Sequence, residues 1–541
     1  GRPGSSVSEP PEFGAGGSLT LDRQPPIGAT RISGPIGTLG RFPLRLLANT
    51  CLLAVAAIAI SLPVGVAIAV YIERTDLRFR RFIRGSMYAL LFVPTFVHVA
   101  AWDAGFGLQG WFGYATGAAV LSGWRATIWL HALTAIPWVT MIATLGLRYS
   151  SASLEELALL ENGARHAFKR ITLRAAFPSI VGCAIWVFIV AANEITITDV
   201  YQVRTYAEEV YVGFALGDGV YEAQARVLPG SLLVTVLVIA SVRIGKHFVS
   251  FHERTQQRTP RPFHISKFRR TFEVAILAFV VLIIAVPLYN LLYKVGIVVE
   301  QSGDERVRLW SVAKVFSVLI DSPFRYASEL RGSFILGQIV SVTTVAFAFI
   351  LAWFRKSKLA TCIGWTVAIA GLAIPAPILA LSIVRLFSQS QSPIVANLYD
   401  SIFVSCVVLT IRCFPFAYLL AIHSVNSVGR RVFEAAALDG LTSWQQLRIV
   451  GLRSLSPFFV ATWVICFAWV IGELSATILT VPPGFNTISV TMFNLVHYGV
   501  EDRLAGLCIV VIGLSAMLAW TGINLIHVAN DSPREISDSN V

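Results

Sequence analysis

Residues 155–198 read EELALLENGARHAFKRITLRAAFPSIVGCAIWVFIVAANEITIT, and residues 434–477 read EAAALDGLTSWQQLRIVGLRSLSPFFVATWVICFAWVIGELSAT. The two stretches align without a gap at a shift of 279 residues. Apolar composition alone would match some Leu, Val and Ala, but not two Glu, an Arg and a Pro in register. The sequence therefore predicts a tandem duplication, whose repeated element is a polar loop followed by an apolar span. The shared positions are Glu155, Ala158, Leu159, Leu173, Arg174, Pro178, Val181, Phe188, Glu194 and Thr198, which recur as Glu434, Ala437, Leu438, Leu452, Arg453, Pro457, Val460, Phe467, Glu473 and Thr477.

The composition is that of an integral membrane protein. Of 541 residues, 55% are hydrophobic and 14% are charged, and the mean hydropathy is +0.69. Soluble domains carry about 25% charged residues. The apolar runs are continuous and close to the roughly 20 residues that a bilayer requires, whereas barrel strands alternate apolar and polar residues. The net charge of +12 fits basic cytoplasmic loops, and because there is no basic soluble domain, nucleic acid is not expected as a partner.

Eleven apolar spans are visible, so the sequence predicts an all-α, polytopic helical membrane protein. Basic residues gather after the first, fifth and seventh spans, which places these three loops on the cytoplasmic face. Both copies of the repeated loop, 149–177 and 425–456, fall on that same face. Six spans separate them, so the repeat is parallel rather than inverted. The spans lie at 45–72, 84–103, 125–147, 179–198, 229–249, 272–294, 335–354, 361–383, 402–424, 458–479 and 504–527.

The two halves differ at their beginnings. The second half opens with an extra span and a polar outer loop, 295–332, before its counterpart of the first span. The chain starts with Gly instead of Met, so we expect a further N-terminal span in a longer protein, twelve in all. A disordered tail or a tag remnant is the alternative. The predicted divisions are an N-terminal Gly/Pro-rich segment 1–44, a first unit 45–250, a basic linker 251–271, a second unit 272–528 and a polar tail 529–541.

The second copy of the loop has the chemistry of two short helices joined by a turn. Gly440 suits the left-handed residue that ends a helix. Thr442 with Gln445, or Ser443 with Gln446, can form a capping box that starts the next helix.

The following span begins close behind this turn. Leu447, Val450 and Leu452 give the second short helix an apolar side, and Pro457 lies near the first turn of the span, where proline is tolerated. The predicted product is a helix–turn–helix on the cytoplasmic surface.

These residues resemble the cytoplasmic loop, called the EAA loop, of ABC importer permeases. The segment Gly472–Thr477, GELSAT, is similar to the corresponding segment of ferric-iron-type permeases, and 193–198 is a looser version. Two fused permease units are typical of the iron(III) and thiamine branches. The resemblance covers nearly the whole chain from residue 45 and implies two tandem type I (MetI-like) permease units.

In that family, the short helix docks into a groove on the ATP-hydrolysing subunit. The first copy departs from the pattern, because Glu161 stands where Gly440 stands, and Asn162-Gly163 would supply the turn slightly later. The alternative to docking is that each loop forms an ordinary amphipathic interfacial helix. The resemblance implies that the docking residues are Glu155, Ala158, Asn162, Gly163, Glu434, Ala435, Ala436, Asp439 and Gly440.

The chain itself carries no chemistry that would hydrolyse ATP. It has no Gly-x-x-x-x-Gly-Lys-Ser/Thr phosphate loop, and its longest non-membrane stretch is about 40 residues. We also find no catalytic or metal-ligand constellation and expect no cofactor. The resemblance implies a non-enzymatic pore in the bacterial inner membrane, surrounded by lipid. Its expected partners are two cytoplasmic ATP-binding cassette subunits and a periplasmic or lipid-anchored solute-binding protein.

The substrate is weakly encoded. Ferric iron is the leading prediction; thiamine, another small cation, polyamine, sulfate and sugar are alternatives. Glu194 and Glu473 lie deep in apolar runs, where an acid is costly. With Thr198 and Thr477 they either line a substrate path, as oxygen ligands of a hard cation, or cap backbone groups at a broken helix.

A secondary transporter with parallel repeats, driven by an ion gradient, is the alternative from another class. It would be expected to carry charged residues in several spans, whereas Asp103, Glu194 and Glu473 are nearly the only acids deep in apolar runs.

Overall fold

The computed structural model describes residues 41–148, 150–215, 230–240, 243, 269–302, 305–355, 357–427, 438–498 and 501–538. By its contacts the chain divides into Gly1–Phe42 and one compact unit, Pro43–Val541, which holds the membrane helices. The N-terminal segment 1–44 and the linker 251–271 lie almost wholly outside the described residues. The expected additional span therefore stays a prediction.

The described residues include eight helices that are long and apolar enough to cross a membrane, and two helix pairs that qualify together but are sharply bent. This confirms the predicted polytopic helical class. Of the predicted span 229–249, the structure describes Gly230–Ala240 as an apolar helix. In order, the first half consists of α1 (Arg41–Arg74), α2 (Arg80–Phe92), α3 (Thr95–Phe106), α4 (Trp111–Thr116), α5 (Gly123–Arg148), α6 (Ala152–Ala167), the π-helical turn η2 (Phe168–Thr172), α7 (Leu173–Asn193), α8 (Thr196–Val200), α9 (Tyr206–Ala215) and the helix Gly230–Ala240.

The second half repeats these elements after an insertion. α1 and α13 end 279 residues apart, and the same shift separates the starts of η2 and η3 and of α7 and α20. In the described residues, α11, the two strands and α12 have no counterpart before α1. The second half consists of α11 (Arg269–Gly296), β1 (Ile297–Ser302), β2 (Glu305–Trp310), α12 (Val312–Arg325), α13 (Ala327–Trp353), α14 (Lys358–Ala373), α15 (Ala376–Ser388), α16 (Pro393–Tyr399), α17 (Phe403–Ser427), α19 (Ser443–Gln446), the π-helical turn η3 (Leu447–Gly451), α20 (Leu452–Gly472), α21 (Thr477–Thr480), α22 (Ile488–Tyr498) and α23 (Glu501–Asp538).

Two of the predicted spans are not single straight helices. The span predicted at 84–103 bends by 102° between α2 and α3, and the span at 361–383 bends by 114° between α14 and α15. The cause is Pro94 in one and Pro375 in the other, because proline lacks the N–H that would continue the helix and forces the preceding residue to be extended. Val93 and Ile374 accordingly have ψ of 120° and 121°.

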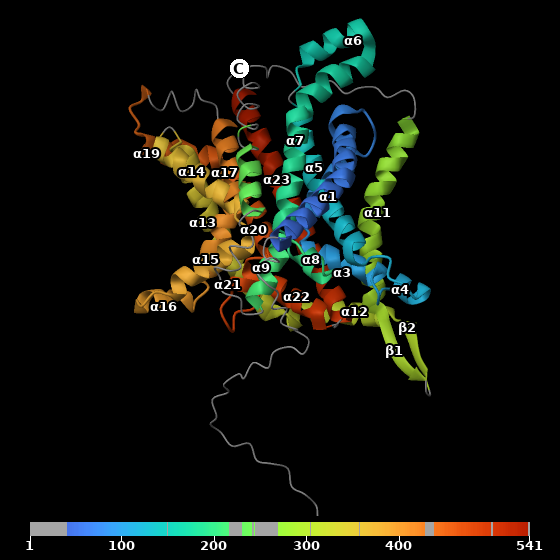
Figure 1. Cartoon of the computed structure of the whole chain (residues 1–541). Helices are drawn as coiled ribbons and strands as arrows, with labels where there is room; N and C mark the ends of the chain where they lie inside the picture. Colours follow the sequence, from blue (N-terminus) through green and yellow to red (C-terminus); the bar gives the residue numbers. More distant parts are fainter. Residues whose placement is uncertain are drawn as a thin grey trace, which may run out of the picture. The chain divides into compact units, whose positions relative to one another are not determined.

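The polar outer loop predicted at 295–332 contains a β-hairpin and is the one departure from an all-helical fold in the described residues. β1 pairs antiparallel with β2, with Ile297 opposite Trp310. β-branched residues and an alternating pattern, such as Val307-Arg308-Leu309, favour strands in this short segment. Figure 1 shows the hairpin with α4, α12 and α16 at one end of the compact unit, and α6 and α19 at the other.

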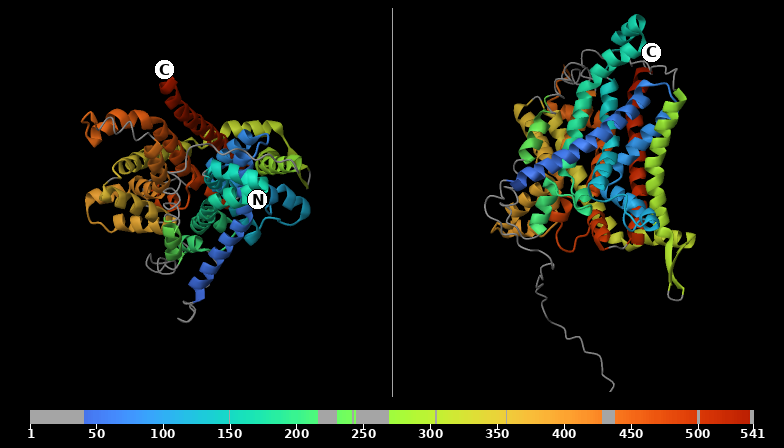
Figure 2. Two further views of the ribbon diagram at one scale, coloured as in Figure 1. Left: turned by 90° about the horizontal axis from the view of Figure 1, so that it is seen from above. Right: turned by 45° about the vertical axis from the view of Figure 1, so that its right-hand side comes forward.

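The two halves are interlocked through their last helices. α23 of the second half packs on α2 and α3 of the first. Conversely, Val234 and Val238, in the helix 230–240, share a hydrophobic cluster with Ala373 of α14. The insertion helix α11 also packs on α3 and α23, on the side of the first half (Figure 2). This exchange explains why Pro43–Val541 behaves as one unit despite the internal repeat.

Close helix approach around the second bend depends on Gly371. A Cβ added there would lie 2.3 Å from the carbonyl oxygen of Ile411 in α17. Gly371→Ala should therefore lower the thermal unfolding midpoint in detergent, because overpacking costs about 1–3 kcal/mol, which exceeds the gain of about 1 kcal/mol in helix propensity.

The matched control is Gly182→Ala in α7, where an added Cβ meets nothing within 4 Å. Its midpoint should be unchanged or slightly raised. A wild-type midpoint for Gly371→Ala would contradict the close packing.

Candidate functional site

Each repeated loop continues as helix into the membrane. In the first half, the part of α6 that follows the kink at Gly163 continues through η2 and α7 to Asn193. The π-helical turns η2 and η3 each end six residues before a proline, Pro178 in α7 and Pro457 in α20. Proline removes one backbone hydrogen bond and crowds the preceding turn, and a π-helical turn is one way to absorb that disruption. Pro457 was expected near the first turn of its span. It lies inside α20 instead, because the helical segment extends back through η3.

Glu155 anchors the first loop to the rest of the protein. Its side chain is buried and forms an ion pair with Arg74, the last residue of α1. It also accepts hydrogen bonds of 2.5 Å from the hydroxyls of Ser150 and Thr172. A buried charge is tolerated only when it is paired and hydrogen-bonded in this way. Glu155 thus joins α1, α6 and η2 from within, and Ala158 is buried beside it.

Both loops turn at a left-handed glycine. Gly440 has φ of 79°, as predicted. In the first copy, Gly163 has φ of 75° and kinks α6, whereas Asn162 has no positive φ. The first copy therefore keeps a left-handed glycine, two residues later than the alignment with Gly440 would place it. The capping box forms between Thr442 and Gln445, with the Thr442 N–H donating to Gln445 Oε1 at 2.9 Å.

The exposed faces of the loops are more apolar than the sequence interpretation assumed. In the first loop Leu154, Leu157 and Leu160 face outward, with Leu160 86% exposed. In the second, Leu438 is 89% exposed and Trp444 59%. The signal in the sequence was a leucine at every third position of α6, on the side opposite Glu155. Of the other predicted docking residues, Asn162, Gly163, Asp439 and Gly440 are exposed, and Glu434, Ala435 and Ala436 lie outside the described residues.

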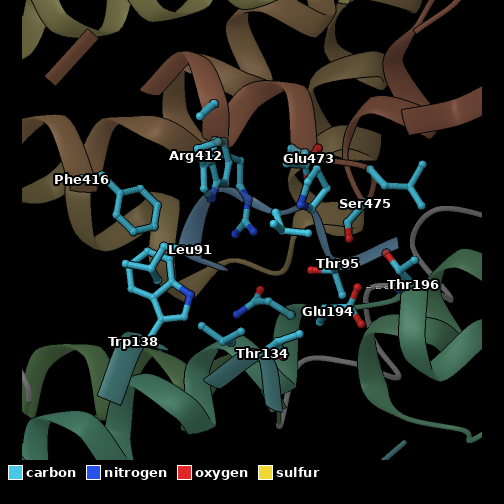
Figure 3. Close-up of a pocket in the computed structure, with 18 of the residues that line it drawn as sticks. Leu91, Thr95, Thr134, Trp138, Glu194, Thr196, Arg412, Phe416, Glu473 and Ser475 are labelled. Carbon is cyan, nitrogen blue, oxygen red and sulfur yellow. Dashed lines mark hydrogen bonds between the residues drawn. The ribbon is translucent and has the colours of Figure 1, made fainter. Parts of the chain in front are cut away.

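A cavity of about 190 Å³ lies where the two halves meet (Figure 3). Its walls come from the α2–α3 bend, α5 and α7 of the first half and from α14, α17 and α20 of the second. Four aromatic rings, those of Trp138, Trp186, Phe416 and Trp469, contact one another across the two halves with centroids 5.2–5.9 Å apart. The polar lining residues are Thr95, His98, Thr134, Asn193, Glu194, Thr196, Arg412, Glu473 and Ser475.

Glu194 and Glu473 occupy equivalent places at the ends of α7 and α20. Glu194 accepts backbone N–H groups of Thr196 and Ile197 at 2.8 and 2.9 Å. Glu473 accepts those of Ala476 and Thr477 at 3.0–3.2 Å. Each carboxylate therefore caps the short helix that follows, the structural role weighed in the sequence analysis, and also faces the cavity.

The two threonines predicted for the substrate path, unlike the two glutamates, are not among the residues that line the cavity. Thr198 and Thr477 are buried and hydrogen-bond to the backbone oxygens of Glu194 and Glu473. The cavity is lined instead by Thr196 and by Ser475.

Arg412 is the functional candidate that the sequence interpretation missed. Its guanidinium projects from α17 into the cavity beside Glu473, opposite Trp138, Thr134 and Glu194 (Figure 3). Nη1 donates to the carbonyl oxygen of Gly371 at 3.0 Å. The sequence did contain a signal for this residue, because an arginine in the middle of the predicted span 402–424 is unusual.

An ion pair between α8 and α22 is among the polar contacts that join the halves at the end that carries the hairpin. His497 Nε2 in α22 lies 3.2 Å from Asp199 Oδ2 in α8, and its Nδ1 lies 2.9 Å from the carbonyl oxygen of Phe493. Both ring nitrogens thus face acceptors, which favours the imidazolium. The hydrogen bond to Asp199 is the main reason that the pKa of His497 is raised above its ordinary value.

Comparison with known proteins agrees with this architecture. Residues 344–529, from α13 to α23, match the family described as binding-protein-dependent transport system inner membrane component. Over 146 residues the chain is 28% identical to PhnV of Salmonella paratyphi A, provisionally named a 2-aminoethylphosphonate transport system permease protein. That alignment covers 27% of this chain and 54% of PhnV, so the chain spans about half the length of these relatives.

A second relative aligns with a shorter part of the chain. The inner membrane ABC transporter permease protein YcjO of Escherichia coli K12 is 29% identical over 90 residues, which are 16% of this chain and 31% of YcjO. The chain is thus a multi-pass inner-membrane protein that is similar, over part of its length, to ABC transporter permease proteins.

Removing the anchor of the first loop should loosen it. Glu155→Ala deletes the counter-charge of buried Arg74, a change that costs about 3–5 kcal/mol for a buried ion pair. We expect a lower thermal midpoint and faster proteolysis within residues 150–172. Glu161→Ala, at an exposed carboxylate of the same helix, should change neither; equal effects of both variants would contradict the anchor.

The His497–Asp199 contact predicts a pH dependence. Because the folded state raises the pKa of His497, its contribution to stability is complete below the unfolded value of about 6.5 and is lost as pH rises through the folded value. The contact is partly exposed, so the contribution should be at most about 1 kcal/mol. The loss of thermal midpoint between pH 6 and pH 9 should be smaller in His497→Gln than in wild type, and identical losses would contradict it.

Proposed function

We propose that the chain is the fused permease of an ABC importer, in which two permease units form one substrate pathway. The family match to residues 344–529 supports this for the second half. The recurrence of η2–α7 as η3–α20 at a shift of 279 residues extends the argument to the first half.

The observation that carries the proposal is the direct helical connection between loop and cavity. The part of α6 beyond Gly163 continues through η2 and α7 to Glu194, and α19 continues through η3 and α20 to Glu473. Helices are stiff, so displacement of a loop would move the carboxylate end of its helix. Closure of two ATPase subunits bound to the loops would then rearrange the cavity between inward-facing and outward-facing states.

The proposed partners follow from the two ends of the molecule. Two separate ATP-binding cassette subunits would bind the exposed leucines of α6 and the region around Leu438 and Trp444. A solute-binding protein would dock at the opposite end, near α22 and the hairpin. The chain supplies the pore and no hydrolytic chemistry of its own. An ion-driven transporter would not need two equivalent loops that lead into the cavity.

For the substrate, we place a small organic solute ahead of ferric iron. The iron prediction rested on the resemblance of Gly472–Thr477 and of two fused units to iron(III)-type permeases, and Glu194 and Glu473 were the suggested oxygen ligands. Here the oxygens of both carboxylates accept backbone N–H groups. Within the described residues, no group of three or more His, Cys, Asp and Glu side chains could hold a metal ion. A solute similar to 2-aminoethylphosphonate, for which the PhnV relatives are named, is one candidate of this small organic class.

The turn glycines test the coupling. Among the described residues, an added Cβ at Gly440 or Gly163 meets nothing within 4 Å, so the main cost of Gly→Val there is strain of the left-handed backbone, on the order of 1 kcal/mol. Gly440→Val should leave the protein inserted and folded but uncouple ATP hydrolysis from uptake, measured in vesicles with the ATPase and binding-protein partners. Gly163→Val should have a similar effect.

The control is Gly123→Val at the start of α5, which also has a left-handed backbone (φ 48°) and open space among the described residues but lies outside both loops, α22 and the hairpin. Normal coupled transport by Gly440→Val and Gly163→Val at wild-type expression would count against the proposed docking role of the loops.

A further inference from the structure

The hydrogen-bonding capacity of the cavity is unevenly used. The oxygens of Glu194 and Glu473 already accept backbone N–H groups. In contrast, Arg412 Nε and Trp186 Nε1 are buried donors without a hydrogen-bond partner among the described residues. Asn193 also lines the cavity, and its Oδ1 is a buried acceptor without a hydrogen-bond partner among the described residues. A buried unsatisfied donor costs about 1–3 kcal/mol, so the lining retains two donors at a cost that a ligand acceptor would remove.

The bend in the helix does not by itself explain Arg412. Since Pro375 has no N–H, it cannot bond to Gly371 O four residues earlier, and Arg412 Nη1 donates to that oxygen instead. In the first half, the equivalent carbonyl of Leu90 receives the backbone N–H of Val93 at 3.3 Å and a hydrogen bond from the His98 side chain. The same bend is thus satisfied there without a guanidinium, and only one nitrogen of Arg412 is used in the second half.

The internal repeat shows that Arg412 is an asymmetric feature of the cavity. It lies three residues before Pro415 in α17, and Thr134 lies three residues before Pro137 in α5. Both side chains line the cavity from opposite halves (Figure 3). The repeated scaffold therefore carries a guanidinium beside the Glu473 carboxylate on one side of the cavity and a neutral hydroxyl on the other.

We propose that the cavity receives an oxyanion group of the transported solute at the guanidinium of Arg412. This inference rests on the proposed permease function and specifies the class of its substrate. A guanidinium presents donors in a planar fork that matches carboxylate and phosphonate oxygens. Trp186 lines the cavity from the first half, and the aromatic rings around it exclude water and strengthen the interaction. The volume of about 190 Å³ restricts the solute to a small one.

The test uses the full chain in lipid nanodiscs and tryptophan fluorescence, because Trp138, Trp186 and Trp469 line the cavity. Two probes of similar size separate the chemistries: ethylphosphonate has an oxyanion and no amine, and ethanolamine has an amine and no oxyanion. Wild type should bind ethylphosphonate and not ethanolamine. Arg412→Gln should weaken ethylphosphonate binding at least about tenfold, since a hydrogen bond to a charged group is lost.

Variants separate binding from folding. Arg412→Gln retains an N–H donor for Gly371 O, and its thermal midpoint is measured alongside; if it does not fold, Arg412→Lys, which keeps the charge and loses the fork, should bind several-fold more weakly. Thr134→Ala is the matched control across the cavity and should bind as wild type does.

Three results would overturn the inference: binding of ethanolamine in preference to ethylphosphonate, no binding of ethylphosphonate by wild type, or wild-type affinity in the folded Arg412 variants. None of them would affect the permease assignment, which the coupling assay with Gly440→Val tests separately.

Discussion

Backbone groups that a broken helix frees inside a membrane have no water to bond to, and the organisation of this protein follows from that constraint. Each half breaks its helices at two places, at Pro94 or Pro375 and at the ends of α7 or α20. Glu194 and Glu473 satisfy the N–H groups that follow, and Arg412 satisfies a carbonyl that a proline leaves without a partner. The polar side chains that repair the breaks are the same ones that line the cavity. Structural repair and the polar lining of the cavity are therefore one arrangement.

The internal repeat gives this arrangement its mechanical form. Two equivalent helical rods lead from the loops to the cavity, and the last helix of each half packs on the other half. The two halves thus bury part of their hydrophobic surface against each other. The bent pairs α2–α3 and α14–α15 bring extended backbone to the centre, where a straight helix would present only apolar side chains.

The two halves have also diverged where function would require it. The first loop is held by a buried ion pair between Arg74 and Glu155, and its left-handed glycine has moved by two residues relative to Gly440. In the cavity, an arginine faces a threonine across the repeat. A fused chain permits such divergence, because each half evolves with its own sequence while the fold keeps them matched. A dimer of identical subunits would carry two copies of every change.

The sequence by itself determined the helical membrane class, the repeat and its register, and the left-handed Gly440, because each depends on local composition or on residues a few positions apart. It also located Glu194 and Glu473, since acids in apolar runs are rare. Only the tertiary structure decided what these residues do. Glu155 was predicted as a docking residue, and in the structure it is buried. The sequence could not show this, because its partners Arg74 and Thr172 are distant along the chain. Arg412 acquires meaning only when α14 and α17 meet, and the bends at Pro94 and Pro375 were overlooked because hydropathy averages across a break. Which polar atoms are satisfied depends on the packing of both halves, and no single stretch of sequence contains that information.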